Sequence, residues 1–419
     1  MKQNTQQITR EPHLLAASCY LLSYLFRGVL SKAIPGISSI LQWIFLIVPF
    51  VILFLDVARS RISFRRTNVT MLAFFIWAGI SSILNADEMT SEMWFSLVSI
   101  LMNGYVLLNA SQYVSEEDYS KWLDRLALIT VLYCSLLGLG SVIAYGTYEA
   151  GIALPFGLNS KERIFTYGHL NQDSRFCGFF GYSTDGGSLC AVSMILSLYL
   201  GDRKKLPGWG AVAGVVLAGA NILLMDVRTS MLIAAAAVLF VLRLHLGTRY
   251  SAKKSDLILL IVVAFTGSAL AFLKQDAIAA FRIEYAENPI RAWQDLSTGR
   301  TTYWIEAFQA FLKKPIYGWG WANSTQTEYF DVHNLIFNLL MWTGIVGMLL
   351  FSAFLVQLLT ACHHSHAALK KQNQIVLILL IAGVLIESML DRAVMSTLNS
   401  SPSTILFWIS AGYILKVSQ

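Results

Sequence analysis

Residues 297–347 read STGRTTYWIEAFQAFLKKPIYGWGWANSTQTEYFDVHNLIFNLLMWTGIVG, and this stretch sets the frame for the rest of the chain. It begins with a polar segment that contains Arg300, continues as a helical pattern and ends in a long apolar run. Pro315 and the glycines after it predict a turn between the two. A helix and a loop of this length fold back on themselves, so we expect Arg300 and His333 to flank one site at a membrane surface.

The composition of the chain is that of a membrane protein. Hydrophobic residues make up 56% of the sequence, charged residues 13%, and the mean hydropathy is +0.57. Soluble domains carry about twice that share of charge. The apolar residues also fall in blocks of about 17–25, which is the length of a helix that crosses a bilayer. We therefore predict an all-α polytopic membrane protein with a single membrane domain over residues 1–419.

About twelve apolar blocks meet this criterion. They are residues 13–30, 37–55, 69–84, 93–110, 126–145, 183–200, 209–225, 229–246, 257–273, 333–358, 375–390 and 402–416. The first block follows Lys2 and Arg10, as a signal peptide would. It has no small-residue cleavage site and further spans follow at once, so we predict that it is a retained span.

Basic residues alternate between the short loops and predict the orientation. Placing the N-terminus inside assigns four basic clusters to the cytoplasm, at residues 59–66, 203–205, 243–254 and 370–371. Both termini are then cytoplasmic. The net charge of +6 is explained by these loops, and no nucleic-acid partner is expected. Two long segments, 146–182 and 274–332, fall on the external side, and the second is the larger loop.

The external loop 274–332 contains a predicted amphipathic helix over residues 301–314. Its apolar residues recur at intervals of three and four, at Trp304, Phe308, Phe311 and Leu312. Pro315 follows its end. Arg300 then lies at the amino end, where the helix dipole favours an anion. The simpler interpretation is that Arg300 is a solvated residue of the first helical turn.

Two further groups stand at the predicted membrane surface. Arg228 lies in a very short turn between two spans, where a guanidinium is well shaped to bind a phosphate. It is equally explained as an ion-pair partner of Asp226. His333 begins the span after the large loop, and histidine suits general-base chemistry near neutral pH. Asp331 is placed to orient it, although a histidine at a span end is more often a hydrogen-bonded interface residue.

Arg175 is a weaker candidate in the first long loop. It precedes the segment FCGFFGYSTDGG, whose glycines allow the backbone to approach a ligand closely. The same glycines are also explained by turns alone. The chain has no phosphate-binding P-loop, no HExxH and no GxSxG motif, which argues against an ATP-driven pump or a metalloprotease. The five cysteines have no metal-ligand spacing, so neither a metal nor a cofactor is expected.

Three segments resemble the O-antigen ligase and polymerase superfamily of bacterial surface-polysaccharide assembly. They are RTSML at 228–232, STGRTTYWIEAFQAFLKKPIYGWG at 297–320 and HNLIFNLLMWTGIVGMLLF at 333–351. The family signature combines Gly-Arg, a tryptophan-bearing helix, Pro-Ile-x-Gly-x-Gly and a His-Asn that opens a span. The resemblance is specific for about residues 225–350; elsewhere it rests on the number of spans and the placement of loops.

The resemblance implies a metal-independent glycosyltransferase of the bacterial cytoplasmic (inner) membrane, with its active site on the external, periplasmic side. Its substrate would be an undecaprenyl-diphosphate-linked oligosaccharide or polysaccharide. Arg228 and Arg300 would hold the diphosphate and His333 would activate the acceptor hydroxyl. Direct displacement would invert the anomeric centre. Further substrate-binding candidates are Arg175, Asn334, Trp304 and Asp331.

The resemblance leaves the acceptor open. We favour a polymerase of O-antigen or capsular repeat units, because the long first loop and the aromatic residues of the second offer surfaces for sugars. The alternative is a ligase that transfers the polysaccharide to lipid A-core. A chain-length regulator is a further candidate partner. Two other classes fit less well: a flippase for lipid-linked sugars, which would have more ionisable residues within its spans, and a non-catalytic lipid-binding scaffold.

Overall fold

The structure is a computed structural model of the 419-residue chain. It describes residues 69–94, 96–98, 100–101, 104, 116–167, 174–180, 183–227, 229–231, 233–235, 300–323, 325–327, 332–364, 371–390 and 402–418, together with residues 18, 47, 51–52, 55, 286 and 288–289.

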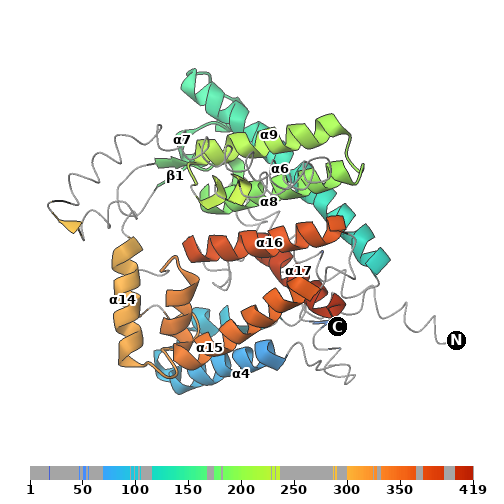
Figure 1. Ribbon diagram of the computed structural model, residues 1–419. Coiled ribbons are helices and arrows are strands. Elements are labelled where there is room, and N and C mark those ends of the chain that lie inside the picture. Colours follow the sequence, from blue (N-terminus) through green and yellow to red (C-terminus); the bar gives the residue numbers. More distant parts are fainter. Residues whose placement is uncertain are drawn as a thin grey trace.

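The described elements are almost all helical (Figure 1). The helices are α4 (Val69–Leu84), α6 (Glu116–Glu149), α7 (Lys161–Ile164), α8 (Ser183–Asp202), α9 (Gly208–Met225), α14 (Arg300–Lys313), α15 (Leu335–His364), α16 (Lys371–Leu390) and α17 (Pro402–Val417), with short 3₁₀ turns at Ala86–Glu88 (η2), Pro155–Gly157 (η3) and Gly178–Phe180 (η4). Two three-residue strands, β1 (Phe165–Tyr167) and β2 (Ser174–Phe176), interrupt this helical pattern. They pair antiparallel, with Thr166 opposite Arg175. No strand is predicted from the sequence of this loop.

Several predicted spans coincide with described helices. These are 69–84 with α4, 126–145 within α6, 183–200 within α8, 209–225 within α9, 333–358 within α15, 375–390 within α16 and 402–416 within α17. Among the described helices, Tyr119–Glu149, Gly208–Met225 and Leu335–His364 are long and apolar enough to cross a membrane. The chain is therefore a mostly helical multi-pass membrane protein. Spans 13–30, 37–55, 93–110, 229–246 and 257–273 lie wholly or largely outside the described residues, so the total of about twelve stays a prediction.

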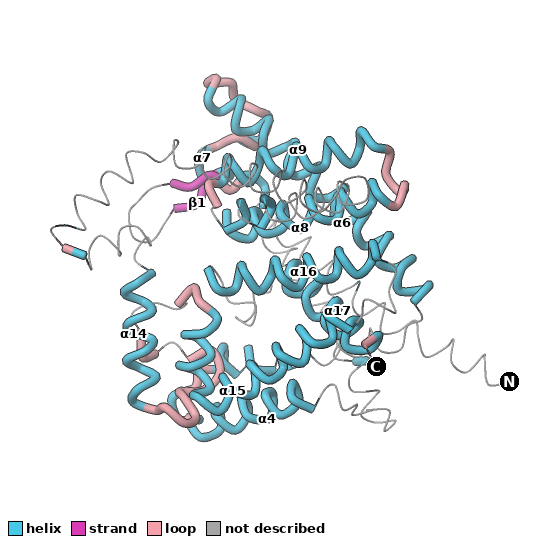
Figure 2. The backbone as a smooth tube through the Cα atoms, in the orientation of Figure 1, coloured by secondary structure: helices cyan, strands magenta, loops and turns pink. Residues whose placement is uncertain are grey.

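The helices pack as a bundle whose outer surface is apolar. Figure 2 shows α8, α9 and α16 running side by side, with α14 crosswise at one end of them. Large apolar side chains remain exposed on the bundle, among them Leu136 at 72%, Val212 at 63% and Val356 at 63%. A surface of this kind is suited to lipid rather than to water, because lipid tails solvate it without a free-energy cost.

One end of the bundle is held together by polar and aromatic contacts. At this end the guanidinium of Arg203, after α8, lies 3.1 Å from Asp124 of α6. The rings of Tyr119 and Tyr413 stack there at 3.6 Å between centroids, joining α6 to the end of α17. The charge pattern predicts that all these positions face the cytoplasm. The fold thus brings together segments that the sequence places on one side of the membrane, while the sidedness itself stays a prediction.

The predicted continuous span at 333–358 is wrong in one respect. Helix α15 is broken at Gly344, whose backbone angles are φ 66° and ψ −168°. Beyond the break α15 pairs with α4: the Thr70 hydroxyl donates to Gln357 at 2.6 Å. The first part, Leu335–Thr343, turns away and runs beside α14 (Figure 1). The reason for the break lies in the turn that follows α14.

Candidate functional site at the start of α14 and α15

Helix α14 has one buried face and one exposed face. Tyr303, Ala307 and Ala310 are buried on one face, and Ile305, Phe308 and Leu312 are exposed on the other. The helix occupies Arg300–Lys313, where the sequence predicts a helix over 301–314. The buried residues recur at intervals of three and four, so one stripe of α14 packs against its neighbour α15.

The first turns of α14 contact the first residues of α15. The indole N–H of Trp304 donates to the carbonyl oxygen of Val332 at 3.1 Å. The Trp304 ring stacks on Phe337 with a centroid distance of 5.8 Å and an interplanar angle of 14°. The ring of Tyr303 lies 6.5 Å from that of His333. Two segments that are 28 residues apart in sequence therefore meet, as expected from the fold-back of this stretch.

Arg300 is the first residue of α14 and is half-buried. It precedes Tyr303 by three residues and Trp304 by four, so all three side chains share a helix face. That face is the one that meets Val332 and His333. The backbone N–H groups of the first turn of α14 add partial positive charge at the same point. A guanidinium and a helix amino terminus together make this position suitable for an anion.

His333 occupies the junction between the loop and α15 in a left-handed conformation, with φ 51°. Histidine is one of the few non-glycine residues that enter this region with some frequency. Its side chain is half-buried, and its Nδ1 atom lies beneath the surface. The left-handed turn directs the chain from Val332, whose carbonyl oxygen accepts from Trp304, into the first turn of α15.

Asn334 caps helix α15. Its side-chain oxygen accepts hydrogen bonds from the backbone N–H groups of Ile336 at 2.9 Å and Phe337 at 3.3 Å. Asparagine is among the preferred residues for this role. Both Asn334 and Trp304 therefore have structural contacts that the sequence analysis did not anticipate. Their part in substrate binding stays a prediction.

Two predicted site residues, Arg228 and Asp331, lie outside the described residues. The structure describes the residues on either side of Arg228, and these residues pack closely on the start of α8. A Cβ atom at Gly187 would lie 2.7 Å from the Ser230 hydroxyl and 2.9 Å from Val227. The neighbouring Ser188 donates to the Glu387 carboxylate of α16 at 2.7 Å. The Glu387 carboxylate therefore binds the start of α8, one residue after the glycine on which this turn packs.

Arg175 lies on β2 and is exposed. The hairpin formed by β1 and β2 is found at the same end of the bundle as α14 (Figure 1). Arg175 therefore shares that end with Arg300 and His333, although the contacts described above join only α14 and α15.

The turn after α14 explains the break in α15. The backbone N–H groups of Trp319 and Gly320 donate to the carbonyl oxygens of Met341 and Trp342, each at 2.9 Å. In return, the N–H of Ile345 donates to the Pro315 carbonyl oxygen at 2.8 Å. The turn thus supplies the partners that a continuous helix would have provided, as a buried backbone requires.

Glycine is needed on both sides of this backbone contact. A Cβ atom at Gly318 would lie 2.6 Å from the Trp342 carbonyl carbon, and one at Gly344 would overlap the Ile316 carbonyl group. Both glycines also have positive φ angles, 70° and 66°. The glycine spacing in PIYGWG and WTGIVG was visible in the sequence, but nothing local to either segment indicates that they pair.

The comparison with protein families agrees with the resemblance noted from the sequence. Residues 213–352 match the family model described as O-antigen ligase, a region that contains α14, the turn and the kinked start of α15. The fold and this match define a multi-pass membrane protein that transfers glycosyl groups. Over this region the chain is similar to the O-antigen ligase and polymerase superfamily, which the match supports. No curated protein matches the chain.

Proposed function

We propose that the protein polymerises undecaprenyl-diphosphate-linked oligosaccharide repeat units on the external face of the cytoplasmic membrane. The observation that carries the proposal is the meeting of α14 and α15. It sets the amino end of a helix that begins with Arg300 beside His333, through the contact of Trp304 with Val332 and of Tyr303 with His333.

In the proposed reaction the hydroxyl oxygen of an acceptor sugar attacks the anomeric carbon of the donor. A C–O bond forms on one face while the bond to the diphosphate oxygen breaks on the other, so the anomeric configuration inverts. His333 accepts the hydroxyl proton, a role that contributes about 10²–10⁴-fold in rate. Undecaprenyl diphosphate leaves with the bonding electron pair, and fixed cations stabilise its developing charge.

Arg300 supplies one of these cations in the proposal, and Arg228 supplies the second. Guanidinium groups bind phosphate oxygens in a bidentate manner and keep their charge at any physiological pH. Two arginines would then take the place of a divalent metal. Arg175, Trp304, Asn334 and Asp331 are proposed to line the path of the sugars.

A second candidate function is that of a ligase with lipid A-core as acceptor. It is favoured by the family model, whose description is that of an O-antigen ligase. The chemistry at the donor is the same in both cases, because only the hydroxyl that attacks differs.

Purified protein with lipid-linked repeat units, with and without lipid A-core, separates the two functions. A ladder of products without the core indicates a polymerase, whereas transfer that requires the core indicates a ligase. Arg300→Ala and His333→Ala should each lower the rate by at least about 100-fold while the protein still inserts in the membrane. Near-normal product from either variant would remove that residue from the mechanism, and retention of the donor configuration would exclude direct displacement.

A further inference from the structure

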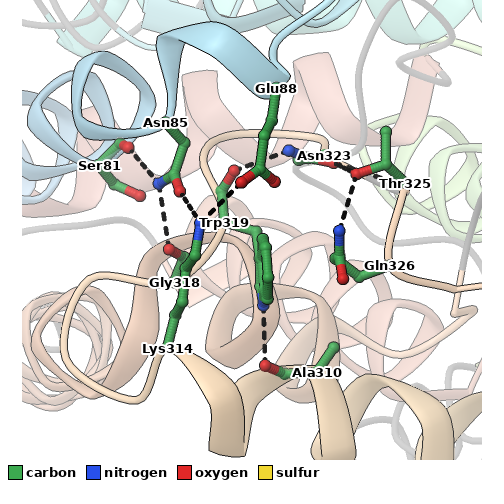
Figure 3. A network of polar contacts seen from close by, with 10 residues as sticks. All are labelled: Ser81, Asn85, Glu88, Ala310, Lys314, Gly318, Trp319, Asn323, Thr325 and Gln326. Carbon is green, nitrogen blue, oxygen red and sulfur yellow. Dashed lines mark hydrogen bonds and ion pairs between the residues drawn. The ribbon is translucent and has the colours of Figure 1, made fainter.

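A lysine at the opposite end of α14 from Arg300 is surrounded by polar and aromatic side chains. Lys314 directly follows α14, and its ammonium group has three partners (Figure 3). It lies 2.5 Å from the side-chain oxygen of Asn85, 3.0 Å from a carboxylate oxygen of Glu88 and 3.8 Å from the ring centroid of Trp319. Its side chain is 21% exposed, so this charge is largely withdrawn from solvent. We call these four residues the Lys314 cluster.

The partners of Lys314 are themselves held in place. The amide nitrogen of Asn85 donates to the carbonyl oxygens of Ser81 at 2.8 Å and Gly318 at 3.1 Å, which leaves its oxygen facing the ammonium group. The indole N–H of Trp319 donates to the Ala310 carbonyl oxygen at 2.8 Å. These hydrogen bonds hold both side chains in the orientation in which they meet the ammonium group.

The Lys314 cluster joins parts of the chain that are remote in sequence. Lys314 and Glu88 are 226 residues apart; Asn85 directly follows α4, and Glu88 is the last residue of η2. Helix α14 is thus held at its last turn by Lys314 as well as by the backbone contacts of the following turn with α15. Its first turns contact α15 through Trp304, and its last turn is held to α4 through Lys314. Because α14 is one continuous helix, a contact at its last turn bears on the position of Arg300 at its first turn.

We propose that Lys314 is a positioning residue, which sets the geometry of α14 for the transfer reaction through Asn85, Glu88 and Trp319. This inference rests on the proposed function of Arg300 and His333. Its physical basis is that a misplacement of reacting groups by about 1 Å lowers a rate by as much as about 100-fold, even when the change lies far from the chemistry. The lysine itself does not touch the substrate.

The test compares two adjacent lysines. Lys314→Met keeps most of the aliphatic stem on Trp319 and removes the charge, whereas Lys313→Met removes an exposed charge one residue away. We expect kcat of Lys314→Met to fall by about 10- to 100-fold with KM for the lipid-linked donor within about 3-fold of the wild type. Lys313→Met should retain wild-type values. Lys314→Arg, which keeps a cation, should recover most of kcat, a rescue that loss of folding alone would not produce.

A distance measurement tests the same proposal without activity. Spin labels are attached through Gln309→Cys on α14 and Leu84→Cys on α4, in a chain whose five native cysteines are replaced by alanine. Both positions are exposed. Lys314→Met should broaden or shift the distance distribution between the labels, and Lys313→Met should leave it unchanged.

The outcomes separate this proposal from the proposed function. If the wild type transfers no sugar with or without lipid A-core, the proposed function fails, and the label distances still decide whether Lys314 holds α14. A Lys314→Met variant with wild-type kcat overturns the positioning role. A fall in kcat with an unchanged distance distribution also overturns it, because the lysine would then act by another route.

Discussion

The backbone hydrogen bonds between α15 and the turn after α14 lead to a quantitative prediction for Gly344→Ala. At φ 66° and ψ −168°, Gly344 occupies a region that is open essentially to glycine alone, and placing alanine there costs about 1–3 kcal/mol. The new Cβ atom would also overlap the carbonyl group of Ile316, which is backbone and cannot rotate away. Overpacking of this kind costs about 1–3 kcal/mol more. We therefore expect a destabilisation of about 4 kcal/mol.

Thermal unfolding of the purified protein in detergent measures this loss. A change of 1 kcal/mol shifts the melting temperature of a large domain by about 2 °C, so Gly344→Ala should melt about 8 °C below the wild type. The matched control is Gly79→Ala. Gly79 lies within α4 and a Cβ atom there has no neighbour within 4 Å, so alanine should be tolerated or slightly stabilising. A Gly344→Ala variant that melts within about 2 °C of the wild type would refute the backbone contact with Ile316.

Three further predictions concern single contacts. Trp304→Phe keeps the stacking on Phe337 and loses the hydrogen bond to Val332. Such a hydrogen bond contributes about 0.5–1.5 kcal/mol, so turnover should fall about 2- to 12-fold. An unchanged rate would show that this bond does not position the site. Asn334→Ala should lower stability by about 1 kcal/mol in the same melting assay, and Asn334→Asp should not, because aspartate also caps helices; equal losses would contradict the capping role. Asp124→Ala leaves Arg203 without its carboxylate partner and should lower the free energy of unfolding by about 3 kcal/mol. A melting temperature equal to that of the wild type would exclude a stabilising role for this ion pair.

Much of the helical framework is a property of the sequence alone. Helix α4 occupies Val69–Leu84, as its apolar block predicts, and α14 begins one residue before the predicted 301–314. These features follow from local information: the length of an apolar block, the spacing of apolar residues on one face and a proline after the last turn. The family signature is local in the same sense, since its residues lie in three continuous segments.

The site depends on contacts that no local pattern contains. The apolar run from Leu335 onward reads as one span, and its break at Gly344 arises only because Pro315 and Trp319 supply hydrogen-bond partners from the facing turn. In the sequence Lys314 is an ordinary basic residue at a helix end. Only the fold brings Glu88, which is 226 residues away, beside it.

Residues 297–347 therefore determine by themselves that a helix, a turn and an apolar run follow one another. Tertiary structure decides that the turn lies in the break of α15, that Asn334 caps a helix and that His333 adopts a left-handed conformation beside Tyr303. The physical reason is that helix formation depends on neighbours within a few residues, whereas the hydrogen-bond partners of a broken helix come from wherever the fold brings them.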